Sequence, residues 1–154
     1  MLTSAQLSEL LPLAAEWVLE QESNILKKGI ELSDDQQIDA YLIGVKEITK
    51  VRLLKVSVVP FPEHELVRNA AFKAGFLTPA TIGLTCRHGI FIKEDHWKER
   101  RLIIHELTHT HQYERFGSIE KFLSQYLHEC LTQGYANSPL EFEARYNEIK
   151  ISGM

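Results

Sequence analysis

Two histidines and a glutamate lie close together in the segment His105-Glu106-Leu107-Thr108-His109. A helix advances about 100° per residue, so side chains four residues apart project from one face, about 40° from each other. Two imidazole nitrogens at that separation can share one tetrahedral Zn²⁺ ion. The spacing therefore predicts that His105 and His109 are metal ligands on a helix.

Glu106 has a different expected role, because its side chain lies at the edge of the face that carries the histidines. From there its carboxylate would reach a metal-bound water instead of the metal and act as a general base. A buried histidine can also be an ordinary core residue, and the motif alone does not separate the two interpretations. Its place inside an uninterrupted helical pattern, which Gly117 ends, favours the metal site.

A third ligand must come from outside this segment, because a catalytic zinc ion usually has three protein ligands and an open position for water. Asp, Glu and His can all serve, and a helix packed across the first one is a natural source. The candidates that follow the motif are His128, Glu129, Glu141, Glu143 and Glu148.

The motif and one later segment together resemble the gluzincin branch of the zincin metallopeptidases, in particular small bacterial domains of that kind. The later segment, Ser138-Pro139-Leu140-Glu141-Phe142-Glu143-Ala144, contains the pattern Pro-x-Glu-x-x-Ala. In gluzincins the third ligand is a glutamate on a helix after the motif, often followed three residues later by alanine. The resemblance implies that Glu141 is the ligand, with Glu143 as the alternative.

The resemblance covers about residues 82–145, and one position departs from it. Many relatives have an aspartate four residues after the ligand glutamate, where this chain has Arg145. A carboxylate that would orient a ligand histidine is therefore missing or supplied by another residue. Glu141 also has a second interpretation, as the third helical residue after the predicted N-cap Ser138.

The activity that the resemblance implies is zinc-dependent hydrolysis of peptide bonds in a peptide or protein substrate. Zn²⁺ would be held by His105, His109 and Glu141, and Glu106 would be the general base. A catalytically inactive zinc-binding scaffold or interaction module of the same fold is the alternative. A domain without any metal is a third interpretation, which elemental analysis would separate from the other two.

Several side chains near the motif could assist such a site. Gln112 is expected on the helix face that carries His105 and His109. His111 points about 200° away from His109 and is expected on the surface or in the core. Three residues could donate to an oxyanion, although ordinary packing is favoured for each: Tyr135, His128 and Arg145.

Hydrophobic periodicity predicts one α+β domain over residues 1–154, with a helical part over 1–50 and the sheet and active-site helices over 51–154. Predicted helices cover about 4–29, 33–48, 63–74, 96–116 and 119–133, with a last helix that opens at 138–141. Predicted strands cover 51–59, 81–86 and 89–92. The first helix starts or kinks near Pro12, the second carries Ile38 and Leu42 on one side, and Asp95 caps the motif helix. Both N-terminal helices are interpreted as scaffold.

The resemblance implies that residues 89–93 form the edge strand that zincins position above the metal. A peptide substrate would add to this edge in the antiparallel sense. Cys86 belongs to the paired strand and is expected to be a buried structural residue, with a thiolate that reaches the zinc as the alternative.

Composition narrows the remaining function classes. The net charge of −4 argues against a nucleic-acid-binding surface, and no apolar run is as long as a membrane span. The first residues contain no basic region before an apolar core, so we expect no signal peptide and a cytoplasmic protein. The two cysteines, Cys86 and Cys130, are too few for a disulfide framework and are expected to be reduced.

Overall fold

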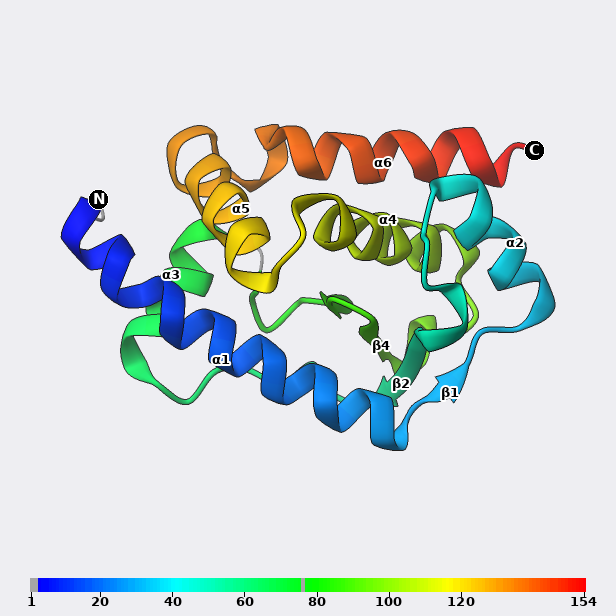
Figure 1. Ribbon diagram of the computed structural model, residues 1–154, viewed down its shortest axis with the longest axis horizontal. Helices are drawn as coiled ribbons and strands as arrows, with labels where there is room; N and C mark the ends of the chain where they lie inside the picture. The colour runs from blue at the N-terminus through cyan, green and yellow to red at the C-terminus, as the bar shows by residue number, and fades with distance from the viewer. Residues whose placement is uncertain (1–2, 76) are drawn as a thin grey trace.

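The computed structural model describes residues 3–75 and 77–154. These residues form an α+β protein with six α-helices and a small mixed sheet of four strands (Figure 1). The elements in chain order are α1 (Ser4–Lys28), β1 (Ile30–Glu31), α2 (Asp34–Ile43), η1 (Ile48–Lys50), β2 (Arg52–Val56), α3 (Glu65–Ala74), β3 (Gly83–Cys86), β4 (Gly89–Lys93), η2 (Glu94–His96), α4 (Arg100–Phe116), α5 (Ile119–Gln133), η3 (Tyr135–Asn137) and α6 (Pro139–Ser152). None of the helices in the described ranges is long and apolar enough to cross a bilayer.

The strand order of the sheet is β1-β2-β4-β3. β2 and β4 are parallel, whereas β3 is antiparallel to β4 and forms the predicted hairpin with it. The prediction that residues 89–93 are the edge strand is wrong, because β4 lies inside the sheet and β3 forms the edge. The continuous apolar run Ile90-Phe91-Ile92 is buried on both faces, as is typical of a central strand.

Helices cover both faces of the sheet. Phe91 packs in a core with Val18 and Ile25 of α1, whereas Ile90 and Ile92 pack in a second core with residues of α2 and α4. α1 lies very close to β4, since a Cβ atom on Gly89 would stand 2.8 Å from the Cβ atom of Ile25. The absence of a side chain at Gly89 therefore permits this approach.

The motif helix α4 lies between the sheet and α6, which runs beside it along the top of Figure 1. α5 connects the two, and Gly117 ends α4 in the left-handed conformation, with φ 89°, as its position predicts. Ser138 caps α6 by accepting a hydrogen bond from the backbone N–H of Glu141. The order α4, α5, α6 thus brings the start of α6 back against the middle of α4.

Two local predictions differ from the structure, whereas the first helix agrees with its predicted range. α1 begins at Ser4 and continues through Pro12, which excludes a start at the proline, one of the two alternatives for that residue. Ile38 and Leu42 of α2 are exposed, because the inward face carries Asp39, whose carboxylate accepts two hydrogen bonds from Arg100. α4 begins at Arg100 instead of near His96, because residues 94–96 form a separate 3-10 turn.

A buried imidazole, that of His88, joins three parts of the fold. His88, in the β3–β4 turn, places Nε2 at 2.9 Å from Oε2 of Glu114 on α4, and Nδ1 at 3.6 Å from Oε2 of Glu22 on α1. Nε2 also lies 3.5 Å from the exposed carboxylate of Glu47. Burial alone disfavours the charged imidazole, but contacts with Glu22 and Glu114 outweigh it and raise the pKa of His88.

Protonated His88 is expected to stabilise the fold in a pH-dependent way. A folded-state pKa above the unfolded value of about 6.5 means that the contribution is complete below pH 6.5. It is lost as the pH rises through the folded-state pKa. Urea unfolding should therefore give a loss of about 1–3 kcal/mol for His88→Gln at pH 5.5, and a smaller loss at pH 9.

The matched control is His128→Gln, which removes an exposed imidazole. It should change the free energy of unfolding little at either pH. A loss for His88→Gln that is equal at both pH values would assign His88 a packing role without a charge.

Candidate metal centre

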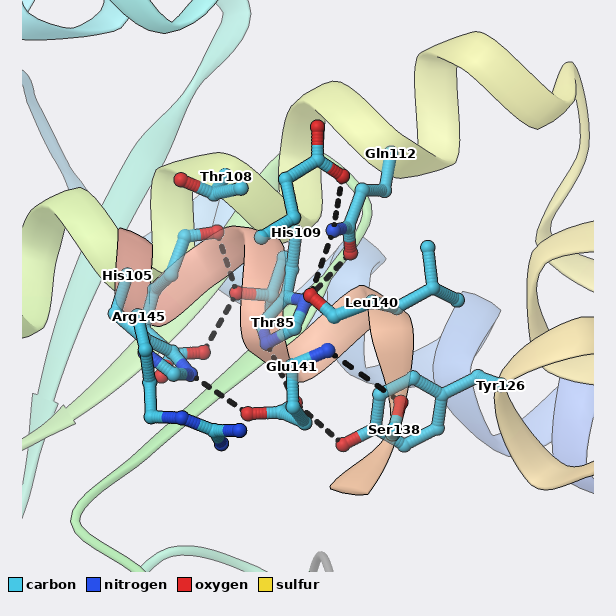
Figure 2. A network of polar contacts seen from close by, with 12 residues as sticks. Thr85, His105, Thr108, His109, Gln112, Tyr126, Ser138, Leu140, Glu141 and Arg145 are labelled. Atoms are coloured by element: carbon cyan, nitrogen blue, oxygen red, sulfur yellow. Dashed lines mark hydrogen bonds and ion pairs between the residues drawn. The ribbon is translucent and has the colours of Figure 1, made fainter. Parts of the chain in front are cut away.

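Three donor atoms from α4 and α6 converge at one point (Figure 2). His105 and His109 project from the same face of α4, and Glu141 lies between them at the first turn of α6. Nε2 of His105 is 3.0 Å from Oε1 of Glu141, and Nε2 of His109 is 2.8 Å from Oε2 of the same carboxylate. The structure therefore brings together the two histidines of the motif and the glutamate that the resemblance implies.

The donor set fits a zinc ion in both chemistry and spacing. All three donor atoms lie within 4.8 Å of one another, whereas ligands at about 2.0–2.2 Å from a tetrahedral zinc ion are roughly 3–3.5 Å apart. Two imidazoles and a carboxylate are ligands that zinc accepts readily. His109 and Glu141 are buried and His105 is partly buried, so the fold already shields the site from bulk water.

The electrostatics of the cluster favour a cation. Burial opposes a charge on His105, but hydrogen bonds to Glu141 and Glu148 outweigh it and raise the pKa of His105 to about 10. Burial likewise opposes ionisation of Glu141, yet the charge of His109 and hydrogen bonds with both histidines lower the pKa of Glu141 well below its usual range. A bound metal ion would replace the protons that balance this carboxylate, so metal binding would release protons.

The outer nitrogens of the two imidazoles are also held in place. Nδ1 of His109 lies 2.7 Å from Oε1 of Gln112, so this nitrogen carries the proton and donates it to the amide oxygen. The amide nitrogen of Gln112 donates in turn to the carbonyl oxygen of Leu140 at 2.9 Å. Gln112 therefore bonds a proposed ligand and leaves Nε2 of His109 to face Glu141.

Glu148 supplies the carboxylate that appeared to be missing at position 145. Its Oε2 lies 2.7 Å from Nδ1 of His105, which orients the imidazole so that Nε2 faces Glu141. Glu148 follows Glu141 by seven residues, which is two helical turns, so both side chains project from one face of α6. This spacing is a signal in the sequence that could have assigned Glu148 an orienting role instead of listing it among the ligands.

Aromatic side chains support the buried half of the cluster. Tyr126 of α5 donates a hydrogen bond of 2.7 Å to Oε2 of Glu141. The His109 ring packs edge-on against the rings of Tyr126 and Phe122, with centroid distances of 5.9 and 6.3 Å. No spacing in the sequence identified Tyr126, because its contact depends on how α5 crosses α4.

Glu106 lies beside the cluster without joining it. Its Oε1 is 2.8 Å from the hydroxyl of Thr85 on β3, and the same hydroxyl is 2.9 Å from the Glu106 carbonyl oxygen. A Cβ atom on Gly83 would lie 3.1 Å from the other carboxylate oxygen, Oε2, so the glycine permits this oxygen to lie close to the strand. The edge strand thus hydrogen-bonds Oε1 of Glu106, whereas no hydrogen bond to Oε2 is found among the described residues.

Two cavities meet at this point, and they share Gly83, His105, Glu106 and Tyr135. The first, here called the apolar pocket, has a volume of about 80 Å³ and is lined mainly by apolar residues of α1, α3 and α5. α1 and α3 thus contribute apolar side chains to the wall of this pocket. The second, here called the open cleft, has a volume of about 380 Å³ and is lined by Gly75, Thr78 and residues 80–83, together with mainly polar residues at the start of α4 and on α6.

The other candidate residues have partners elsewhere. Glu143 pairs with Arg115 and accepts from Gln112, and Glu129 caps the start of α6 by accepting from Ser138 and the N–H of Leu140. His128 is exposed and His111 contacts the carbonyl oxygen of Gly44, as expected for a residue that is not a ligand. Cys86 and Cys130 are buried free thiols. Burial raises the pKa of Cys86, which disfavours the thiolate that the alternative role requires.

The chain was also compared with models of protein families, with curated proteins and with solved structures. None of the three comparisons gave a match. The resemblance to gluzincins therefore rests on the residues of this chain and on the site that they form.

Proposed function

We propose that this protein is a zinc-dependent peptidase of the zincin type, in which His105, His109 and Glu141 hold the metal. The observation that carries the proposal is the convergence of these three donors beside Glu106, at the junction of two cavities. A zinc ion, when bound, supplies a Lewis acid that polarises a carbonyl group and lowers the pKa of water. The geometry supports this function better than a purely structural metal site, because an acidic side chain and space for a ligand adjoin the donors.

Glu106 is the proton carrier in the proposed reaction. Its Oε1 is held by Thr85, so Oε2 is the oxygen that takes a proton from the attacking water. The same oxygen then returns the proton to the leaving amine. Tyr135 is half-buried and lines both cavities, which makes it the best-placed donor for the developing oxyanion.

The zincin-like fold is supported by the position of β3. The resemblance implies an edge strand above the metal, and β3 is the edge strand that touches Glu106 through Gly83 and Thr85. We propose that a peptide adds to the free side of β3, in place of the strand that the sequence suggested. The chain lacks Asp at position 145, and the contact between Glu148 and His105 supports the peptidase over the inactive scaffold, because it gives that histidine an orienting carboxylate.

The direct test is hydrolysis of a mixed library of peptides by the zinc-loaded protein, before and after the metal is removed by a chelator. The expected result is cleavage that chelation abolishes and added zinc restores. If the zinc-loaded protein cleaves nothing in a broad library, the non-catalytic zinc-binding module becomes the better interpretation.

Thr85 is expected to act as a positioning residue for Glu106. Thr85→Val keeps the side-chain shape but removes the hydroxyl, and it should lower kcat by about tenfold, as expected for the loss of one hydrogen bond to a charged group. Thr85→Ser retains the hydroxyl and should restore most of the activity. Zinc content, measured on the same samples, should be unchanged in both variants.

A purely structural role for Thr85 predicts another pattern. In that case the valine and serine variants would lose activity in proportion to their loss of stability, and the hydroxyl would make no difference. Urea unfolding of each variant provides this comparison.

A further inference from the structure

The open cleft contains one cationic side chain close to the proposed metal ligands. Arg145 lies on α6 one turn after Glu141, and it lines the cleft together with His105, Glu106 and Tyr135. Figure 2 includes Arg145 in the view of the site. A ligand bound in the cleft would therefore lie close to Arg145.

The guanidinium group of Arg145 has little of its bonding capacity used. Its Nη2 donates one hydrogen bond of 2.6 Å to the carbonyl oxygen of Ala136, out of the five N–H donors that an arginine carries. Among the described residues it forms no ion pair, whereas four other arginines are each paired with a carboxylate. These pairs are Arg52–Glu31, Arg87–Glu22, Arg100–Asp39 and Arg115–Glu143.

The carboxylates that line the cleft cannot easily form an ion pair with Arg145, because each already has a partner. Glu148 contacts His105, Glu99 contacts His96 at 2.6 Å, and Glu106 contacts Thr85. A planar guanidinium with free donors, half-buried beside a hydrolytic site, is suited to a two-point interaction with a carboxylate. The natural source of such a group is the substrate.

We propose that Arg145 binds a carboxylate of the substrate and gives the enzyme a preference for peptides with an acidic group near the scissile bond. This inference rests on the proposed peptidase function. The carboxylate is either an Asp or Glu side chain or the free C-terminus of a short peptide. Arg145 is thus a specificity residue, and a role for it as donor to the oxyanion is the alternative that the experiment must separate.

The experiment measures kcat/KM on three matched peptides with the same apolar residues. The first has blocked ends and one Glu, the second has blocked ends and Gln in its place, and the third has Gln and a free C-terminus. Each peptide is made with the variable residue at successive positions on both sides of the cleaved bond. Wild type should prefer the Glu peptide over the Gln peptide if a side chain is recognised, and the free C-terminus over the blocked end if the terminus is recognised.

Arg145→Gln should remove this preference, lowering kcat/KM on the order of tenfold for the carboxylate peptide while leaving the neutral peptide unchanged. Arg145→Lys, which keeps the charge but not the planar fork, should retain part of the preference. The matched control is Arg101→Gln, which removes an exposed arginine of α4 that does not line the cleft. It should behave as wild type.

A binding measurement provides a readout without turnover. Zinc-loaded Glu106→Gln, in which we expect cleavage to be slow, is titrated with the fluorescently labelled carboxylate peptide and with its neutral counterpart. The added change Arg145→Gln should weaken binding of the first peptide only, and raising the salt concentration should have a similar effect.

The outcomes distinguish failure of the inference from failure of the proposed function. If wild type cleaves no peptide, the proposed function fails. If wild type cleaves the matched peptides equally well, the function stands and the carboxylate preference is refuted. If Arg145→Gln lowers kcat to the same extent for charged and neutral peptides, Arg145 acts on the oxyanion and the inference is also refuted.

Discussion

Glu106→Gln is expected to lower peptide hydrolysis on the order of 10²–10⁴-fold while zinc stays bound. Glutamine keeps the shape of the side chain and can still contact the Thr85 hydroxyl, but it cannot accept a proton from water. The expected loss is the amount that a positioned general base contributes. The measurement compares turnover of the same peptide library by wild type and variant, with the zinc content determined on the same samples.

The zinc content of the Glu106→Gln variant is the second measurement of this prediction. Glu106 does not belong to the three-donor cluster, so its replacement should leave the metal in place. A variant that loses its zinc would show that Glu106 is a ligand or holds one in position. Equal turnover by the two proteins would mean that the activity comes from a contaminant or that another residue is the base.

The second large effect concerns zinc affinity in a graded series of variants. His105→Ala, His109→Ala and Glu141→Ala each remove one proposed ligand and should nearly abolish binding of the single zinc ion. Glu148→Gln removes only the carboxylate that orients His105 and should weaken affinity roughly 10–100-fold. Glu143→Ala is the matched control, because this glutamate lies on the same helix but pairs with Arg115 and Gln112.

Competition with a chromogenic zinc chelator measures the whole series under one set of conditions. Glu143→Ala should bind zinc nearly as well as wild type. If it loses zinc more completely than Glu141→Ala, the third ligand is Glu143 and the geometry of the metal-bound protein differs from the one described. Full zinc occupancy in either histidine variant would rule out the site.

Both predictions depend on the ionisation state of the cluster, so they are best tested at neutral pH or above. Zinc must displace the protons that His105 and His109 hold in contact with Glu141. Lowering the pH is therefore expected to weaken zinc binding for every variant in the series. Comparisons between variants should be made at one pH.

The sequence by itself determined the local parts of this protein. The four-residue spacing of His105 and His109 places both imidazoles on one face of any helix that contains them, whatever surrounds it. Gly117 and Ser138 likewise act within a few residues, so the end of α4 and the start of α6 follow from them. The α+β class could also be predicted, because helical and strand periods alternate along the chain.

The tertiary structure alone decided which distant residues complete the site. Strand order is one example, since the hairpin 81–93 is compatible with either strand at the edge, and only pairing with β2 buries β4. Thr85 and Tyr126 are others, because their contacts with Glu106 and Glu141 join segments that no local pattern relates. The burial of apolar surface that packs α1, α5 and α6 around α4 is a sum over the whole core and is nearly indifferent to sequence distance. For that reason the motif could be recognised from its own residues, whereas the contacts of Thr85 and Tyr126 became visible only in the folded chain.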